Sequence, residues 1–433
     1  MTPTRLVWLA TTAFAATFGA LAVLRHRAFG TGRFDLGNMT QAVWSTANGH
    51  VLSVTDVRGE QVSRLGSHFD PILVALAPLW WLWPSPELLL VVQAVAVALG
   101  TLPVFWLARA HLDSERAAAA LAATYLLYPP VQWLTVSDFH PVALACPLLL
   151  LAWWFLDQRR LLPFALCAAL AVTAKEHVGL TVAAMGLWYA LRYRAPRIGL
   201  VVAATAGAVA LVAALVVVPH YAAAGTSAFE SRYDDLALDG RDISYVAALL
   251  LPLGLLPLAA PLALVAALPE LALNMLSSTV TQTSVKTHYA ATAIPGLLAA
   301  TTYAVERFGD RLAYLAAAAA LVGAVVLGPI GRIDITAGAH DAAARRALTV
   351  VPDNAAVSAT NALGAHLSAR RRIFSFPILR DATWVAVDTT RLTFLDSLRP
   401  AGSVGPLADL ARDRGWQRVF EEDGILVFHK RGR

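Results

Sequence analysis

Three adjacent ionisable residues, Lys175, Glu176 and His177, stand between two strongly apolar runs. The runs, 161–174 and 178–191, would each form a helix of about 21 Å, whereas the hydrocarbon core of a bilayer is about 30 Å thick. Ionisable groups at that depth are tolerated where protein or a water-filled cavity surrounds them. We therefore expect a polar cavity in which Lys175 binds an anionic group such as a phosphate. The alternative is a Lys175–Glu176 ion pair that only holds helices together.

Asp35 is a candidate for acid–base chemistry. It lies in a loop after the first apolar run, together with Gly30, Gly32 and Gly37. Glycine allows a backbone to bend closely around a ligand. A carboxylate near the membrane interface could take a proton from an acceptor hydroxyl group. The alternative is that Asp35 caps the helix predicted for "LGNMTQAVW", because aspartate is a favoured N-cap residue.

Other polar residues gather in the segments "GSHFDP", "VSDFHPVA" and "SSTVTQTSVKTHY". They supply the remaining candidates for substrate binding, which are His68, Asp70, Asp138, His140, Lys286, His288 and Tyr289. Histidine and carboxylate side chains suit zinc or manganese, but their spacing here matches no metal-binding motif. The sequence allows a divalent metal without requiring one, and the cofactor stays unknown. Asp138 could instead cap the helix that follows it.

The composition is that of a membrane protein. Of the 433 residues, 58% are hydrophobic and 15% are charged, whereas a soluble domain has about 45–50% apolar and about 25% charged residues. Long apolar stretches recur from residue 6 to residue 330, which indicates a polytopic protein surrounded by membrane lipids. The net charge of +5 comes mostly from arginines at the ends of predicted helices. It therefore indicates membrane topology and not nucleic-acid binding.

About eleven membrane-spanning helices are predicted from these stretches. Their ranges are 6–24, 86–108, 117–136, 141–157, 161–174, 178–191, 198–218, 244–259, 262–277, 290–305 and 312–330. One set of connections carries Arg109, Arg116, Arg159, Arg160, Arg192, Arg194, Arg197, Arg307 and Arg311. The positive-inside rule places that set in the cytoplasm, and an odd number of spans then places the C-terminal part outside. The short apolar segment 70–84 is interpreted as re-entrant or interfacial; the alternative is that it spans the membrane, which would move residues 25–69 inside.

The C-terminal part has α/β character. The segments "AAVSATNALGAHL", "RRIFSFPI" and "ATWVAVDTT" resemble short strands near helices. The segment "PLADLARDRGWQRVFEEDGILVFHK" predicts a helix and then two strands joined at Asp423-Gly424. We therefore expect a transmembrane domain over 1–330, with a long first outer loop at 25–85, and a small extracytoplasmic domain over 331–433.

Five ordered blocks carry a resemblance to a known family. They are "FDLGNMTQAVW", "LGSHFDPILVALAPLWWLWPSP", "SDFHPVALACPLLLLAW", "KEHVGL" and "HYAATAIPGL", and the tail is also similar in "SATNALGAHLSARRRIF". The chain resembles the bacterial membrane proteins of domain of unknown function 2079, which in turn resemble the GT-C glycosyltransferases. The resemblance implies an all-α polytopic fold, a cytoplasmic N-terminus and a catalytic aspartate in the first outer loop, which maps to Asp35. It also implies helices lying along the membrane in that loop. Many GT-C enzymes carry adjacent acidic residues at this place, whereas Asp35 stands between Phe34 and Leu36.

The function expected from these observations is transfer of a sugar from a polyprenyl-phosphate donor to an unknown acceptor at the outer membrane face. Asp35 would be the base, and Lys175, with Lys286 and His288, would bind the lipid phosphate. Glu176 would orient Lys175. The acceptor side would be shaped by His68, Asp70, Asp138 and His140, and all these polar segments would line one outer cavity. The alternatives are a transporter or lipid flippase, and a non-catalytic envelope assembly factor. Polar residues collected at one face, without a matching cytoplasmic set, argue against the transporter.

Overall fold

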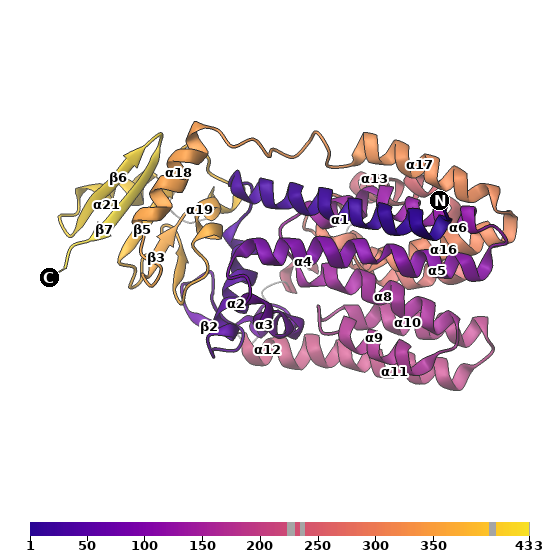
Figure 1. Cartoon of the computed structure of the whole chain (residues 1–433). Helices are drawn as coiled ribbons and strands as arrows, with labels where there is room; N and C mark the ends of the chain where they lie inside the picture. Colours follow the sequence, from indigo (N-terminus) through magenta and orange to yellow (C-terminus); the bar gives the residue numbers. More distant parts are fainter. Residues whose placement is uncertain (223–229, 234–238, 398–403, 433) are drawn as a thin grey trace. The chain divides into compact units, whose positions relative to one another are not determined.

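The computed structural model describes residues 1–222, 230–233, 239–397 and 404–432. The chain divides into two compact units, and each is described by itself (Figure 1). The helical unit comprises Met1–Ala20, Leu65–Ile72 and Val91–Ile333, and the mixed unit comprises Leu21–Arg64, Leu73–Leu90 and Asp334–Arg433. The loop that carries Asp35 is thus grouped with the C-terminal domain, whereas the domain boundary expected from the sequence lies at residue 330.

The helical unit is built from helices that follow the predicted apolar ranges, although residues 21–27 and 86–90 of these helices belong to the mixed unit. They are α1 (Pro3–Arg27), α4 (Pro86–Leu99), α5 (Thr101–His111), α6 (Glu115–Leu127), α7 (Pro129–Val136), α8 (Pro141–Asp157), α9 (Leu161–Ala171), α10 (Val178–Arg192), α11 (Pro196–Val212), α12 (Val218–Tyr221), α13 (Gly240–Leu250), α14 (Pro261–Leu264), α15 (Leu268–Met275), α16 (Ala293–Phe308) and α17 (Arg311–Leu327). The predicted helix 244–259 was wrong in its second half, because α13 ends at Leu250 and left-handed backbone angles at Gly254 and Leu255 interrupt the chain. The predicted helices 86–108 and 117–136 are divided at Gly100 and at Tyr128. Two prolines follow Tyr128, and proline cannot donate the backbone hydrogen bond that would continue α6.

Helix length separates these elements into two groups. Among the described residues, three helical stretches are long and apolar enough to cross a membrane, and they are Pro3–Arg27, Pro86–His111 and Pro196–Tyr221. Shorter apolar helices include Pro141–Asp157, Leu161–Ala171, Val178–Arg192, Pro261–Met275 and Arg311–Leu327. Helices therefore form in the predicted ranges, except that 3-10 turns replace the α-helix at 251–260, and the count of about eleven spans stays a prediction.

The segment 70–84 forms a short helical stretch. A 3-10 helix at Pro71–Leu76 leads into α3 (Ala77–Trp80), and the chain turns before α4 begins. Ten residues rise about 15–20 Å as α- or 3-10 helix, which is less than the thickness of the hydrocarbon core. The re-entrant or interfacial position of this segment stays a prediction.

The C-terminal part of the mixed unit is a five-stranded sheet of order β4-β3-β5-β7-β6. The strands are β3 (Val357–Ala359), β4 (Ile373–Ser375), β5 (Trp384–Asp388), β6 (Trp416–Glu422) and β7 (Ile425–Lys430). β3 pairs parallel with β4 and β5, while β7 pairs antiparallel with β5 and β6. Asp423 and Gly424 join the last two strands with positive φ angles of 47° and 76°, as a two-residue hairpin turn requires. All the strands predicted for this part are present.

Helices and the first loop complete the mixed unit. The helices are α18 (Ala339–Val350), α19 (Asn361–His366), α20 (Phe394–Ser397) and α21 (Val404–Arg412). Buried alanines of α18 pack with β3 and β7 residues such as Val357 and Val427 to form the apolar core. The first loop contains a π-helix at Arg33–Gly37, α2 (Asn38–Ala47), and the small antiparallel pair β1 (Ser53–Thr55) and β2 (Gln61–Ser63).

Candidate functional site

Most of the polar residues singled out in the sequence meet inside the helical unit. We call this group the histidine–glutamate cluster, and it consists of His68, His140, Lys175, Glu176, His177, Glu270, His288 and Tyr289. The turn between α9 and α10 presents Lys175, Glu176 and His177. The other members come from the segment 65–72, the connection between α7 and α8, helix α15, and the 3-10 helix before α16. Apolar helices thus hold charged side chains at their connections.

Glu176 is bound by the segment that carries His68. Its Oε1 lies 2.9 Å from His68 Nδ1, and its Oε2 accepts the Phe69 backbone N–H at 3.0 Å. A further backbone bond joins Ile72 N–H to the Thr173 carbonyl at 3.1 Å. These contacts link two segments that are about a hundred residues apart in sequence. Glu176 therefore has His68, and not Lys175, as its close partner.

His177 contacts a second buried glutamate. Its Nε2 lies 2.9 Å from Glu270 Oε2, although the ring is not aligned for a hydrogen bond. The Glu270 side chain is 3% exposed and also accepts a short hydrogen bond from the Thr292 hydroxyl. Sequence reasoning missed Glu270. The signal was present, because a glutamate in the apolar run "LPELALNML" is itself a candidate functional residue.

Lys175 has an aromatic partner instead of a carboxylate. Its Nζ lies 5.1 Å from the centroid of the Tyr289 ring, within the range of a cation–π contact. Within the described residues, no carboxylate lies within ion-pair distance of Lys175. The Tyr289 ring is held in turn, because its hydroxyl accepts from Arg232 at 3.3 Å and its carbonyl from Asn274 at 2.7 Å. The lysine charge is therefore available to an incoming anion.

Two histidines stack beside this lysine and tyrosine. The centroids of the His140 and His288 rings are 3.5 Å apart, and the angle between the two ring planes is 19°. The centroid of the His288 ring also lies 4.1 Å from that of the Tyr289 ring. His140 Nδ1 lies 2.8 Å from the Asp138 carbonyl. Asp138 is buried and does not cap α8, whose N-cap residue is His140 without a side-chain cap bond.

The remaining candidates lie elsewhere or contribute differently. Asp70 is buried in the helical unit, with 1% exposure. Lys286 is exposed, and its backbone N–H donates to Ser284 Oγ at 3.2 Å. Asp35 belongs to the mixed unit and lies in the π-helix; Gly37 is the N-cap residue of α2, so Asp35 does not cap that helix. Among the described residues, no group of three or more potential ligands could hold a metal ion.

A second polar group, which we call the Asp157 network, joins helix ends on the arginine-rich side of the helical unit. Asp157 Oδ2 lies 3.0 Å from His111 Nε2 and accepts from Gln158, while Oδ1 accepts from Tyr303 at 2.8 Å and Tyr193 at 3.1 Å. His111 Nδ1 lies 2.9 Å from Glu306. The expectation that this side would lack a polar set was therefore wrong. Single ionisable residues at helix ends do not reveal in the sequence that they converge.

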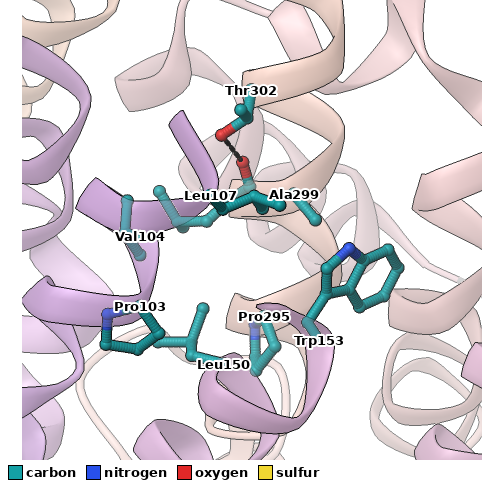
Figure 2. Close-up of a pocket in the computed structure, with 9 residues that line it drawn as sticks. Pro103, Val104, Leu107, Leu150, Trp153, Pro295, Ala299 and Thr302 are labelled. Carbon is teal, nitrogen blue, oxygen red and sulfur yellow. Dashed lines mark hydrogen bonds between the residues drawn. The ribbon is translucent and has the colours of Figure 1, made fainter. Parts of the chain in front are cut away.

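A small apolar recess lies next to this network. It is too narrow to admit a water molecule, and its lining residues are Pro103, Val104, Leu107, Leu150, Trp153, Pro295, Leu298, Ala299 and Thr302 (Figure 2). The Thr302 hydroxyl donates to the Leu298 carbonyl at 3.0 Å, and the Trp153 indole donates to the Tyr303 hydroxyl at 3.1 Å. No charged side chain lines the recess, so it does not suit a phosphate group.

The fold is shared with a solved membrane-protein structure. ArnT from Cupriavidus metallidurans in the apo state superposes with a TM-score of 0.55 at 13% identity, covering 97% of this chain and 98% of ArnT. The structure of the same protein bound to undecaprenyl phosphate gives a TM-score of 0.53 at 12% identity, covering 96% of this chain and 98% of that one. At this identity the likeness establishes the fold. No curated protein matches the chain.

The family model identifies the family of this chain, whereas the structural similarity identifies only its fold. The model described as "Predicted membrane protein (DUF2079)" matches residues 25–427. This range contains the Asp35 loop, every member of the histidine–glutamate cluster and nearly all of the C-terminal sheet. The chain is therefore a member of the DUF2079 family of membrane proteins.

Proposed function

We propose that this protein is a GT-C-type glycosyltransferase that moves a sugar from a polyprenyl-phosphate donor to an acceptor at the outer membrane face. The observation that carries the proposal is Lys175. It is a cation in a connection between apolar helices, and the neighbouring carboxylates Glu176 and Glu270 contact histidines instead. A cation in such surroundings needs an anion, and a lipid phosphate would supply it. The shared fold with ArnT, which was crystallised with undecaprenyl phosphate, supports this lipid class.

The proposed reaction assigns one role to each group. The acceptor hydroxyl oxygen forms a bond to the anomeric carbon of the sugar while the bond from that carbon to the phosphate oxygen breaks. Asp35 takes the hydroxyl proton, and the electron pair leaves with the lipid phosphate. Lys175, with Lys286 and His288, stabilises the negative charge that develops on the phosphate. We assign His68, Asp70, Asp138 and His140 to the acceptor side, and place His177 and Tyr289 around the phosphate.

The transporter and flippase alternatives have to be judged on contacts and not on polarity alone, since the Asp157 network gives the arginine-rich side its own polar set. Each carboxylate oxygen of Asp157 is already engaged twice, by His111 and Gln158 and by Tyr193 and Tyr303. A fully engaged carboxylate holds helix ends together and leaves little capacity for a transported substrate. This closed network supports the enzyme over the transporter. It does not separate the enzyme from a non-catalytic assembly factor, and ligand binding tests that choice.

The test is the thermal stability of the purified chain with and without undecaprenyl phosphate. Lys175→Met removes the charge and keeps the apolar stem, so the variant should fold but lose most of the stabilisation by the lipid. Lys430→Met is the matched control, because Lys430 also lies over an aromatic ring, 5.9 Å from the Trp416 centroid, but in the C-terminal sheet. This control should keep the full effect of the lipid. Stabilisation of the Lys175→Met variant equal to that of the wild type would exclude the proposed phosphate site.

A further inference from the structure

The π-helix that carries Asp35 packs against the C-terminal domain of the same unit. The Phe34 backbone N–H donates to Asn361 Oδ1 at 3.3 Å. A Cβ atom placed on Gly32 would lie 2.6 Å from Asn361 Nδ2, and one placed on Gly37 would lie 3.3 Å from the backbone of Ala365. The residues before and after Asp35 therefore lie directly on α19.

Arg33 ties the same π-helix to the sheet. Its side chain is buried, with 2% exposure. Its guanidinium donates to Ser375 Oγ at 2.8 Å, the Ile373 carbonyl at 2.6 Å and the Thr55 carbonyl at 2.9 Å. Its aliphatic stem packs on Gly364 of α19, where a Cβ atom would lie 3.0 Å from the Arg33 Cβ. The arginine thus spans from the edge strand β4 to α19.

The contacts between the π-helix and the C-terminal domain lie at the edge of the sheet where α/β folds commonly place their functional sites. Asn361 lies two residues after the end of β3, and Ser375 ends β4, so both lie at the carboxyl ends of parallel strands. Sites in α/β sheets form at that edge. Asn361 is itself held, because its backbone N–H donates to Asp396 Oδ1 at 2.8 Å. A π-helix is rare, and short π-helical segments are frequent at functional sites.

We propose that Asn361 and Arg33 are positioning residues that hold the π-helix in the form that presents Asp35, so that the C-terminal domain takes part in the transfer reaction. This inference rests on the proposed role of Asp35 as the base. It explains why the motifs "FDLGNMTQAVW" and "SATNALGAHLSARRRIF", more than 300 positions apart, occur together in one chain. The Asp35 segment is shaped by the second motif and cannot keep its geometry without it.

Hydrogen–deuterium exchange on the full-length protein tests the proposal without a known acceptor. In Asn361→Ala, peptides covering 31–38 should exchange about five-fold faster, the factor expected for one lost hydrogen bond of about 1 kcal/mol. Labelling of the half-buried Asp35 carboxylate by a carbodiimide and an amine should rise in the same variant. Asn361→Asp keeps an acceptor oxygen at the first position of α19, where a carboxylate is tolerated, and should restore both readouts. Asn354→Ala, an exposed asparagine of the same domain, is the matched control and should change neither readout.

Three results would overturn the proposal. The first is an unchanged exchange rate of peptides 31–38 in Asn361→Ala. The second is an exchange rate in Asn361→Asp as fast as in Asn361→Ala. The third is an equal rise in the exchange rate of all peptides from 334–397 in Asn361→Ala, which would indicate general destabilisation. Stabilisation by undecaprenyl phosphate is measured in parallel and should be the same in Asn361→Ala and wild type. If the lipid stabilises neither, the glycosyltransferase proposal fails while the exchange result still decides the structural one.

Discussion

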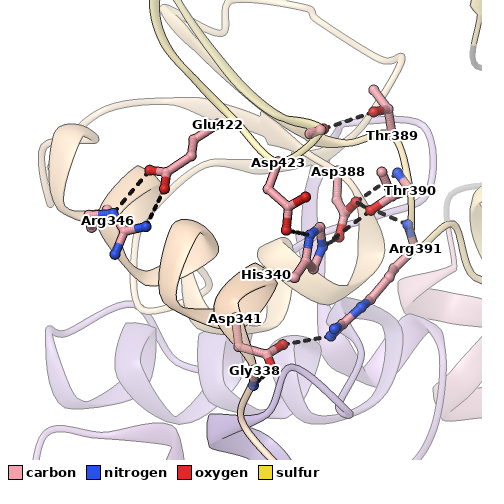
Figure 3. Close-up of polar contacts among 11 residues, drawn as sticks. Gly338, His340, Asp341, Arg346, Asp388, Thr389, Thr390, Arg391, Glu422 and Asp423 are labelled. Carbon is pink, nitrogen blue, oxygen red and sulfur yellow. Dashed lines mark hydrogen bonds and ion pairs between the residues drawn. The ribbon is translucent and has the colours of Figure 1, made fainter.

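At the scale of single residues, histidine is the recurring partner of carboxylates, most of which are buried. His68 contacts Glu176 and His177 contacts Glu270 in the helical unit. In the mixed unit, His340 lies between Asp388 at 2.9 Å and Asp423 at 3.0 Å (Figure 3). A buried carboxylate requires donors, and a histidine can supply one without adding a permanent charge. The sequence shows these histidines and carboxylates but not which of them pair.

The His340 contact predicts a pH-dependent stability of the C-terminal domain. Burial acts to lower the pKa of His340, but the hydrogen bond and charge of Asp388, with help from Asp423, raise it overall despite the nearby Arg391. Burial likewise acts to raise the pKa of Asp388, and its bonds from His340 and from the 390–391 backbone lower it overall. A raised histidine pKa adds stability below the unfolded value of about 6.5, and this is lost as the pH rises through the folded value.

We therefore expect the domain to lose unfolding free energy as the pH rises above the unfolded histidine pKa of about 6.5 and through the raised folded pKa of His340. His340→Gln should remove most of this dependence. The measurement is exchange of peptides from 338–341 and 386–391, comparing variant with wild type at each pH. The control is His50→Gln, since His50 is exposed in the first loop. An equal loss of stability in wild type and His340→Gln would show that another group titrates.

At the scale of elements, close helix packing supports the turn that presents Lys175. α10 follows that turn, and its glycines meet α11 without a side chain between the backbones. A Cβ atom on Gly186 would lie 2.7 Å from the Gly199 carbonyl and 2.8 Å from the Ala203 nitrogen. Membrane helices associate through such small residues, because lipid gives them little hydrophobic drive to pack. The orientation of α10, and with it the place of His177, depends on this contact.

Gly186→Ala should therefore destabilise the protein by about 1–3 kcal/mol, because the added methyl group meets backbone atoms that cannot move independently. Gly207→Ala is the matched control on α11, since nothing lies within 4 Å of a Cβ atom there. The control should be neutral or slightly stabilising, given the higher helix propensity of alanine. Thermal unfolding of both variants in the same detergent measures the difference. Equal melting temperatures would mean that the α10–α11 contact is looser than described.

At the scale of the whole molecule, the two compact units combine segments that are distant in sequence. The mixed unit unites the first loop with the C-terminal sheet, and the helical unit takes in the segment Leu65–Ile72. The membrane topology proposed for this arrangement has the arginine-bearing connections in the cytoplasm and residues 331–433 outside. That orientation would place the Asp35 loop and the sheet domain in the same compartment.

Cysteine labelling in intact cells tests the topology. In a chain whose natural cysteines, Cys146 and Cys167, are replaced by alanine, a membrane-impermeant maleimide should label Arg412→Cys directly. It should label Arg197→Cys, on an exposed position of α11, only after the membrane is permeabilised. The opposite pattern would invert the topology. Labelling of both positions in intact cells would contradict the five spans predicted between residues 197 and 412.

The sequence by itself determined the elements. Apolar runs ended by arginine, glycine or proline predicted the helices, and the short apolar strands with the Asp423-Gly424 turn predicted the sheet, because these signals are local and periodic. The Lys175–His177 turn was identified for the same reason. Only the tertiary structure decided the pairing of Glu176 with His68 and of Glu270 with His177, the Asp157 network, and the contact of the Asp35 π-helix with Asn361. These contacts depend on which side chains meet in the folded chain, often between residues more than a hundred positions apart. A hydrophobic pattern that repeats every few residues does not specify such pairs.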